Sequence, residues 1–291
     1  MLLLGCGRGI ALAFALAFTA SDTVHAAPTP APDVDLLLNQ AQAANAKGET
    51  SVARDLATKA IAAAPKNPQG YWVRGRIYAT EKNHREAIAD FTRGLEIEPR
   101  AAEVYQLRGF ENFRDGNFTA AIADFDKAIH FVPAQEPYHW QRGIAQYYAG
   151  RYEDGRKQFE LHQTVNSNDV ENAVWHFLCY SRIAGVEKAR AGLIPIKGDT
   201  RVPMMTVYEL FAGRAKPEDV LKEAGGSYSS EAQLKQQMFF AHLYLGLYYE
   251  AHGKPDLAKE HIGKAAYEYP QNHYMGDVAR VHARVLGIKP R

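Results

Sequence analysis

Residues recur along this chain at a fixed interval of 34, and that interval constrains the fold more than any other feature. A period near 34 is typical of a unit made of two short helices and stacked on copies of itself. Each unit buries its apolar face only against its neighbours, so the period predicts a solenoid. The recurring residues are three prolines and three arginines, each arginine followed by a glycine: Pro65, Pro99 and Pro133, and Arg74, Arg108 and Arg142.

Small and aromatic residues occupy matching positions in each unit, and each has a mechanical reason. In the unit 102–135, Gly109 lets two helices touch, Gly116 permits a tight turn, and Phe125 fills the gap between the helices. Pro133 ends the second helix because proline cannot continue it. The pattern resembles the tetratricopeptide repeat (TPR). We therefore expect an all-α chain folded as a TPR-type α-α superhelix, or solenoid.

The match to this pattern is uneven, which predicts regular and irregular parts. Pro270 closes a good copy near the C-terminus, whereas "NAVWHFLCYSRIAG" begins a copy that degenerates after Ala191. The glycine- and serine-rich stretch from Gly225 to Glu231 is the expected hinge or mobile loop. The expected segments are clear repeats at 68–101, 102–135, 136–169 and 239–272, degenerate repeats at 34–67 and 170–192, irregular helices at 193–230, and a C-terminal capping helix at 273–287.

The first residues carry the pattern of a secretory signal. Arg8 precedes a short apolar run, and Ala26 is a small residue of the kind that signal peptidase accepts. The apolar run is too short to span a bilayer. We therefore expect the mature protein in the periplasm or outside the cell, with no transmembrane segment. The expected parts are a cleaved signal at 1–26, a Pro-rich flexible leader at 27–33 and a single solenoid domain at 34–291.

The chain has two cysteines, Cys6 and Cys179. Cys6 follows a lipobox-like "LLG", but the apolar core comes after it rather than before it, so lipid attachment there is not expected. Cys179 lies in an apolar helical stretch, where a lone cysteine usually packs as a small hydrophobe. The alternative is a closed pocket near Trp175, His176 and Cys179, belonging to an enzyme or a small-molecule binder in which His176 activates the thiol.

Nothing else in the sequence points to catalysis or metal binding. The net charge of +1 does not steer the chain toward nucleic acid or an anionic membrane. Motifs for hydrolase nucleophiles, zinc ligands and phosphate loops are missing from the sequence. His139 and His242 fall at an aromatic position of their repeats, which favours packing over metal coordination. We therefore expect no enzymatic activity, no cofactor and no metal site.

Surface recognition is better supported, because the first helices of the clear repeats carry aromatic residues at the positions that line the concave face of a TPR superhelix. Aromatic and arginine side chains dominate binding hot spots, so this surface suits a protein or peptide partner. The alternative is that the terminal helices of the chain fill the groove themselves. The candidate partner-binding residues are Trp72, Arg76, Gln106, Phe110, Phe113, Arg114, Trp140, Ile144 and Tyr147.

The recurring arginines have a different expected role, because they occupy the seventh position of each unit, on the face turned to the neighbouring helix. Asp90 and Asp124 recur on the second helices of the first two clear repeats. We expect structural pairs of Arg74 with Asp90 and Arg108 with Asp124, since an unpaired buried cation is costly. Gln158 stands where the third aspartate should be, so Arg142 needs another partner.

The order of parts also resembles the NlpI-like bacterial envelope TPR proteins. The likeness rests on "HWQRGIAQYYAGRYEDGRKQFELHQ", then "NAVWHFLCYSRIAG", "MTVYELFAGRAKPEDVL" and "FFAHLYLGLYYEAHGKPDLAKEHIGKA", and it includes the irregular middle. The resemblance implies a non-enzymatic adaptor that docks a periplasmic protease and cell-wall hydrolases, and that often dimerises. The namesake of that family is a lipoprotein, whereas this chain has the pattern of a conventional cleaved signal.

Overall fold

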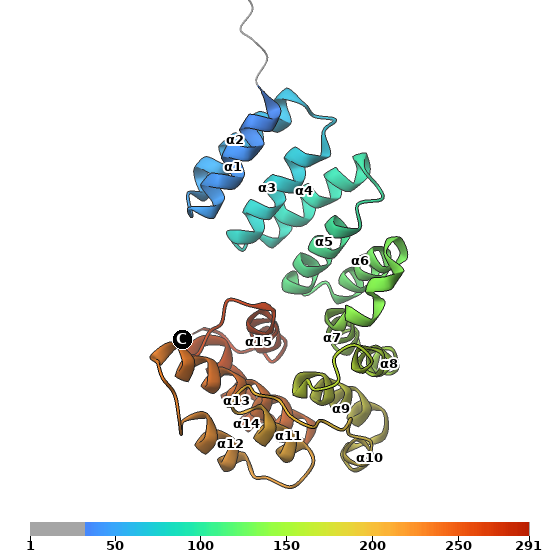
Figure 1. Ribbon diagram of the computed structural model, residues 1–291, viewed down its shortest axis with the longest axis vertical. Coiled ribbons are helices and arrows are strands. Elements are labelled where there is room, and N and C mark those ends of the chain that lie inside the picture. Colours follow the sequence, from blue (N-terminus) through green and yellow to red (C-terminus); the bar gives the residue numbers. More distant parts are fainter. Residues whose placement is uncertain (1–32, 291) are drawn as a thin grey trace, which may run out of the picture. The chain divides into compact units, whose positions relative to one another are not determined.

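The computed structural model describes residues 33–290, and every regular element in that range is a helix (Figure 1). The predicted signal and residues 27–32 of the predicted leader lie outside the described residues. From Asp33 onward the chain forms one compact unit. The predicted all-α superhelix of stacked hairpins is confirmed.

Helices pack in consecutive pairs, and the second helix of one pair contacts the first helix of the next, as α2 does α3 and α4 does α5. This is the contact pattern of a solenoid. The pairs are α1 (Val34–Ala46) with α2 (Thr50–Ala63), α3 (Pro68–Thr80) with α4 (His84–Ile97), α5 (Ala102–Asp115) with α6 (Phe118–Phe131), α7 (Trp140–Tyr148) with α8 (Tyr152–Gln163), α9 (Val170–Ala184) with α10 (Val186–Ala191), and α13 (Glu231–Ala251) with α14 (Pro255–Gly263).

Glycine sets how closely the helices of a pair approach. A Cβ atom on Gly109 of α5 would lie 2.6 Å from the ring of Phe125 on α6, which is closer than two carbon atoms can pack. Gly116, between the same helices, has a φ of +92°, a conformation that glycine adopts without a steric penalty. The two glycines and the phenylalanine of the repeat pattern thus fix one hairpin geometry.

The predicted repeat 136–169 differs from its neighbours at its start. Residues Pro133–Tyr138 form a short 3-10 helix, η1, and α7 begins only at Trp140, so it has 9 residues where α5 has 14. Pro137 lies inside η1. Proline lacks an N–H and disfavours the α conformation of the residue before it, so the α-helix starts after it.

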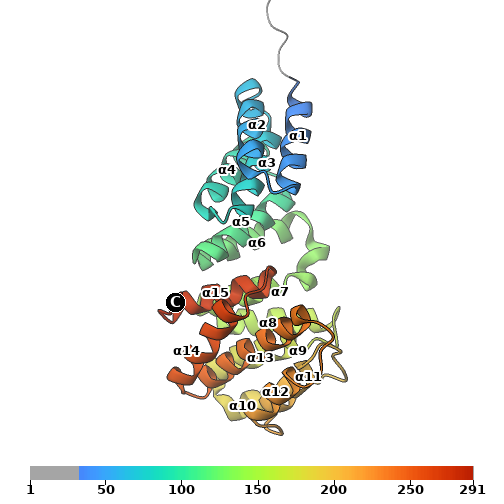
Figure 2. The same ribbon diagram turned by 90° about the vertical axis from the view of Figure 1, so that its left-hand side faces the viewer.

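The irregular middle contains α11 (Met204–Phe211) and α12 (Pro217–Ala224), which pack against α13. After α14 the chain passes through η2 (Lys264–Glu268), a π-helical turn, and ends in α15 (Tyr274–Val285). This last helix turns back toward the earlier repeats, where it contacts α5 and lies beside α7 (Figure 2). The C-terminal helix therefore packs against the first helices of the second and third clear repeats.

The apolar core is uneven along the chain. Around α1 to α3 it is a small cluster built mainly from alanines such as Ala53 and Ala57, whereas one large cluster extends from Phe113 to Ala283. Alanine buries little apolar surface, and burial of apolar surface is the main stabilising term. The N-terminal repeats therefore depend more on polar contacts between helices than the rest of the chain does.

The recurring arginines supply such contacts, because each links its own repeat to the preceding one. Arg74 bonds Asp90 at 2.7 and 2.8 Å, and also reaches Thr58 Oγ1 at 3.1 Å. These partners lie on α4 and α2, on either side of α3. The hydrogen bond to Asp90 raises the pKa of the Arg74 guanidinium above its ordinary value.

Arg108 and Arg142 repeat this arrangement with one exchange. Arg108 bonds Asp124 and, at 2.9 Å, Thr92 Oγ1. Arg142 bonds Gln158 at 2.9 Å in its own repeat, and its nearest carboxylate partner is Asp126 of the preceding repeat, at 2.7 Å, with Glu136 at 3.7 Å. Asp126 occupies the position of Thr92 one repeat earlier, so the acid has moved to the other side of the arginine.

This exchange can be tested by moving the carboxylate back. Asp126→Thr should destabilise the protein by about 1 kcal/mol, because it leaves the half-buried Arg142 guanidinium with only the more distant carboxylate of Glu136, at 3.7 Å. Adding Gln158→Asp to that variant should restore most of the lost stability, since it recreates the arrangement of the carboxylate around Arg74 and Arg108. The measurement is urea unfolding at pH 7. A double variant no more stable than Asp126→Thr would contradict the assignment.

A pair of buried histidines lies between α13 and α14. The Nδ1 atoms of His242 and His261 are 2.8 Å apart, so one ring donates and the other accepts. The ring of His242 also stacks on Tyr269. Burial, together with the neighbouring His261 and Lys264, lowers the pKa of His242 to about 4, and burial lowers that of His261. The pair is therefore neutral at pH 7.

We expect this pair to make the fold acid-sensitive. Between pH 6.5 and about 4 the unfolded chain binds a proton that His242 in the fold does not, so the unfolding free energy falls as the pH is lowered through this window. His242→Asn should reduce the slope by up to about 1.4 kcal/mol per pH unit. His130→Asn, at an exposed histidine, is the matched control. Equal slopes in all three proteins would refute the assignment.

Candidate functional site

The nine predicted partner-binding residues come from the first helices of three consecutive repeats, and the term inner face is used here for the surface that these positions form. They are Trp72 and Arg76 on α3, Gln106, Phe110, Phe113 and Arg114 on α5, and Trp140, Ile144 and Tyr147 on α7. Their environments differ greatly, and the difference follows from where α15 lies.

Tyr274, the first residue of α15, occupies the middle of the inner face. Its ring lies 5.6 Å from that of Phe110, 5.4 Å from Phe113 and 5.1 Å from Trp140, measured between centroids. Its hydroxyl is buried and has no hydrogen-bond partner among residues 33–290. A tyrosine thus takes the place that a partner's aromatic anchor would take, and this part of the groove is filled by the chain itself.

Polar contacts hold α15 in this position. Arg114 Nε donates to Asp277 at 2.7 Å, and the Tyr148 hydroxyl and His282 Nδ1 are 2.8 Å apart. His282 Nε2 lies 2.7 Å from a carboxylate oxygen of Glu250 on α13. A hydrogen bond between charged groups is stronger than a neutral one, so the Arg114–Asp277 bond, together with the Tyr148–His282 bond, fixes the register of α15 on α5 and α7.

Two further inner-face residues belong to the core. Ile144 is fully buried, and Tyr147 packs its ring 5.5 Å from that of Trp175 on α9. Burial is the main reason that the pKa of Tyr147 is raised above its ordinary value. Neither side chain offers a surface to a partner in this conformation.

The part of the inner face on α3 and the start of α5 is more open. Arg76 is exposed and forms an ion pair with Glu103, and Gln106 is half-buried. Trp72 is half-buried because its indole packs against α4, where a Cβ on Gly94 would meet it at 2.2 Å. The accessible chemistry of this part is therefore more polar than the aromatic pattern of the sequence suggests.

A polar cleft of about 610 Å³ adjoins this open part. It lies where the turn between α3 and α4 faces α15. Asp277 pairs with both Arg114 and Arg280. Lys82 adds a further positive charge, so the cleft carries an excess of positive charge that favours an acidic or carboxylate-bearing segment. The lining residues are Ala79, Thr80, Lys82, His84, Arg114, Asn272, Asp277 and Arg280.

A buried carboxylate, that of Glu111, contacts two of the side chains that line this cleft. Glu111 accepts from His84 at 2.6 Å and pairs with Arg114, which in turn bonds Asp277. Removing Glu111 would leave His84 without its acid and Arg114 with Asp277 alone, so the network orients the side chains that line the cleft.

Lys82 is the cleft residue that the sequence pattern could have revealed. It stands at the turn position where Gly48, Gly116 and Gly150 stand in the other repeats. Its φ of 62° makes it the one non-glycine residue with positive φ in the described part of the chain. Such strain persists where the surroundings require it and is frequent at functional sites. A lysine in place of the turn glycine is thus a functional signal.

The alternative site at Trp175, His176 and Cys179 is divided among different environments. Cys179 is fully buried against Gly155, and burial raises the pKa of its thiol well above the usual range, so it is not a thiolate at neutral pH. His176 pairs with Glu160 at 3.3 Å. Trp175, however, lines a cavity that does not include the other two residues.

Neither a membrane-spanning helix nor a metal-binding cluster is present among residues 33–290. None of the helices within residues 33–290 combines the length and apolar character needed to cross a bilayer. Across the same range, no group of three or more histidine, cysteine, aspartate or glutamate side chains is arranged to hold a metal ion.

The comparisons with known proteins agree with the repeat pattern. Residues 38–102 match the family model for the tetratricopeptide repeat. No curated protein matches the sequence. A tetratricopeptide repeat protein from Parabacteroides merdae ATCC 43184 is similar in structure, with a TM-score of 0.56 and 15% identity over 87% of this chain and 98% of that one.

A structure of MamA is also similar, with a TM-score of 0.52 and 17% identity over 68% of this chain and 97% of that one. At these identities the likeness shows the fold. The chain therefore contains tetratricopeptide repeats and folds as their superhelix, and the NlpI-like layout stays a resemblance.

The position of Tyr274 can be tested with two substitutions. Tyr274→Ala should destabilise the protein by about 3 kcal/mol and shift indole emission to longer wavelength, because it opens the aromatic cluster around Trp140. Tyr274→Phe keeps the ring and removes only the unpaired hydroxyl, so it should be neutral or slightly stabilising. Urea unfolding followed by fluorescence measures both. If Tyr274→Ala left stability and emission unchanged, α15 would not fill the groove in solution.

Proposed function

We propose that the protein is a non-enzymatic scaffold that binds a protein partner on the open, polar part of the inner face and in the cleft beside it. The observation that supports this proposal is the cleft lined by Lys82 and Arg280. It extends from the end of α3, which carries the exposed Arg76, to α15. The aromatic positions further along are occupied by α15, so the partner meets charged and polar side chains first.

The charges of this surface define the partner's chemistry. Lys82 and Arg280 line the cleft, and Arg280 is paired with the carboxylate of the cleft, Asp277, so Lys82 is the main positive group offered to a partner. Charge complementarity governs specificity and association rate more than affinity. We therefore propose that the partner presents an extended segment or helix end rich in acidic residues.

The signal pattern at residues 1–26 supports an exported protein, in the periplasm or outside the cell. Within that setting, the NlpI-like order of parts supports an adaptor role toward envelope proteases or peptidoglycan hydrolases. An acidic surface segment on such an enzyme would be the group that the cleft recognises.

Charge reversal on the open surface tests this proposal. In a crosslinking pull-down from the native envelope, the Arg76→Glu/Lys82→Glu variant should recover its partners at least about tenfold less well than wild type, because two attractive contacts become repulsive. Both residues are exposed, so folding should be retained, and thermal unfolding checks this.

The matched control changes the same charge on the second helices, with Lys59→Glu on α2 and Lys127→Glu on α6, both exposed. This variant should recover every partner as wild type does. Equal recovery by both double variants would refute the surface assignment. Loss of all partners in both would point to a general electrostatic effect instead.

A further inference from the structure

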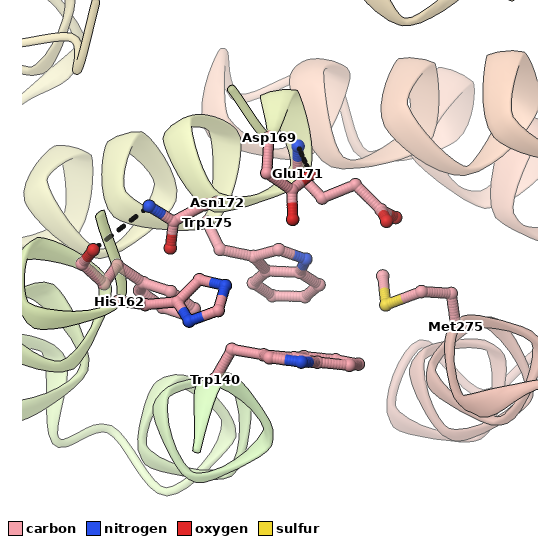
Figure 3. Close-up of a pocket in the computed structure, with 8 residues that line it drawn as sticks. Trp140, His162, Asp169, Glu171, Asn172, Trp175 and Met275 are labelled. Carbon is pink, nitrogen blue, oxygen red and sulfur yellow. Dashed lines mark hydrogen bonds between the residues drawn. The ribbon is translucent and has the colours of Figure 1, made fainter. Parts of the chain in front are cut away.

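A small cavity of about 100 Å³ lies between α7, α8, α9 and α15, apart from the polar cleft (Figure 3). The rings of Trp140 and Trp175 lie on opposite sides of it, and the sulfur of Met275 and the carboxylate of Glu171 lie beside them. The cavity is thus a space walled by two indoles, with a polar side. Its volume suits a group of about five to seven non-hydrogen atoms.

Two of its buried polar atoms lack partners. Trp175 is 1% exposed and Asn172 is 3% exposed, and both line the cavity. Within the described part of the chain, neither Trp175 Nε1 nor Asn172 Oδ1 makes a hydrogen bond. The Asn172 amide nitrogen already donates to the Phe159 carbonyl at 3.0 Å, which fixes the amide so that its oxygen is left free. Buried polar atoms are nearly always satisfied, so these two require a ligand or water.

A third polar atom adds acceptor capacity. His162 Nδ1 lies 2.8 Å from the Pro137 carbonyl oxygen, to which it must donate. In the neutral ring this leaves Nε2 as an acceptor, and His162 also lines the cavity. Apart from its carboxylates, the cavity therefore offers one donor, the indole N–H of Trp175, and two acceptors, Asn172 Oδ1 and His162 Nε2.

The polar side of the cavity carries an excess of negative charge. Asp169 and Glu171 line it, and a single guanidinium, Arg201, pairs with both of them and with Asp199. Three carboxylates thus share one cation. Burial is the main cause that raises the pKa of Glu171, and the Arg201 guanidinium opposes this shift.

We propose that this cavity binds a cationic nitrogen group, a guanidinium or alkylammonium, that has an oxygen acceptor close by, as in a basic amino acid or a basic residue of a peptide. The cation lies between the indoles, where the faces of aromatic rings attract it. Asn172 Oδ1 and His162 Nε2 accept its N–H groups, Asp169 and Glu171 balance its charge, and the Trp175 N–H donates to the oxygen. An anion would meet the carboxylates, and an apolar group would leave the polar atoms unpaired.

The probes are L-argininamide and L-citrullinamide, which differ only in whether the side chain ends in a guanidinium or in a neutral urea of the same shape. Indole fluorescence and calorimetry measure binding to the full mature chain. We expect saturable binding of argininamide at least about tenfold tighter than that of citrullinamide. Equal binding of the two amides, or no saturable binding of argininamide, overturns the proposal.

Substitutions test whether argininamide binds in this cavity. Trp140→Leu should weaken argininamide binding about tenfold, and Glu171→Gln should remove most of the preference over citrullinamide. Trp72→Leu is the matched control, since it removes the indole from the same position two repeats earlier, away from the cavity. Because Glu171 also contacts Tyr244 and Arg201, thermal unfolding accompanies each titration, and Trp140→Leu decides if Glu171→Gln fails to fold. If Trp72→Leu weakened binding as much as Trp140→Leu, the site would lie elsewhere and the proposal would fail.

A third probe distinguishes the source of the cation. A blocked peptide with one central arginine should bind more tightly than argininamide if the natural occupant is a partner's side chain, and more weakly if it is a free small molecule. Either result supports the cation site. Arg76→Glu/Lys82→Glu should leave argininamide binding unchanged, so the cavity and the partner surface can fail independently.

Discussion

Each recurring arginine is clamped between the second helix of its own repeat and the second helix of the preceding repeat. In a solenoid every unit contacts only its neighbours, so the interfaces between units determine whether the array holds together. Around α1 to α3 the buried residues are mostly alanines, so the hydrogen bonds of the recurring arginines supply a large share of the contact between repeats. Around Arg142 the nearest acid is Asp126 instead of a residue at the Gln158 position, so the carboxylate that pairs with the arginine does not need a fixed position.

The repeats could be predicted from the sequence because their contacts are local, between helices that follow one another. The pairing of Arg74 with Asp90 is of this kind. The pairing of Arg142 with Asp126 follows from the same period, because Asp126 lies 34 residues after Thr92. It could be predicted only if the hydrogen bond from Arg108 to Thr92 of the preceding repeat were already known. The approach of Tyr274 to Phe110 could not be predicted, because it depends on small rotations that accumulate over several repeats and on an irregular segment without a period.

The position of α15 changes which chemistry the inner face offers. Phe110, Phe113 and Trp140 have the composition of a binding hot spot, yet here they form a cluster around the chain's own tyrosine. Aromatic side chains bury large apolar areas, so the same property suits them to a partner or to a terminal helix. Composition alone does not separate these uses. What is left for recognition is the strip where a lysine, Lys82, takes a turn position that elsewhere is glycine.

The cavity beside Trp175 also depends on α15. Its walls come from α7, α8, α9 and α15, and Met275, which lines it, directly follows the Tyr274 that fills the groove. One turn of helix therefore closes the aromatic cluster and completes the cavity. Any change that moved α15 away from α5 would open both at once, whereas the polar atoms of Asn172 and His162 would keep their places on α9 and α8. The donor and acceptor set is thus built into the repeats, and the C-terminal helix supplies one wall of the cavity through Met275.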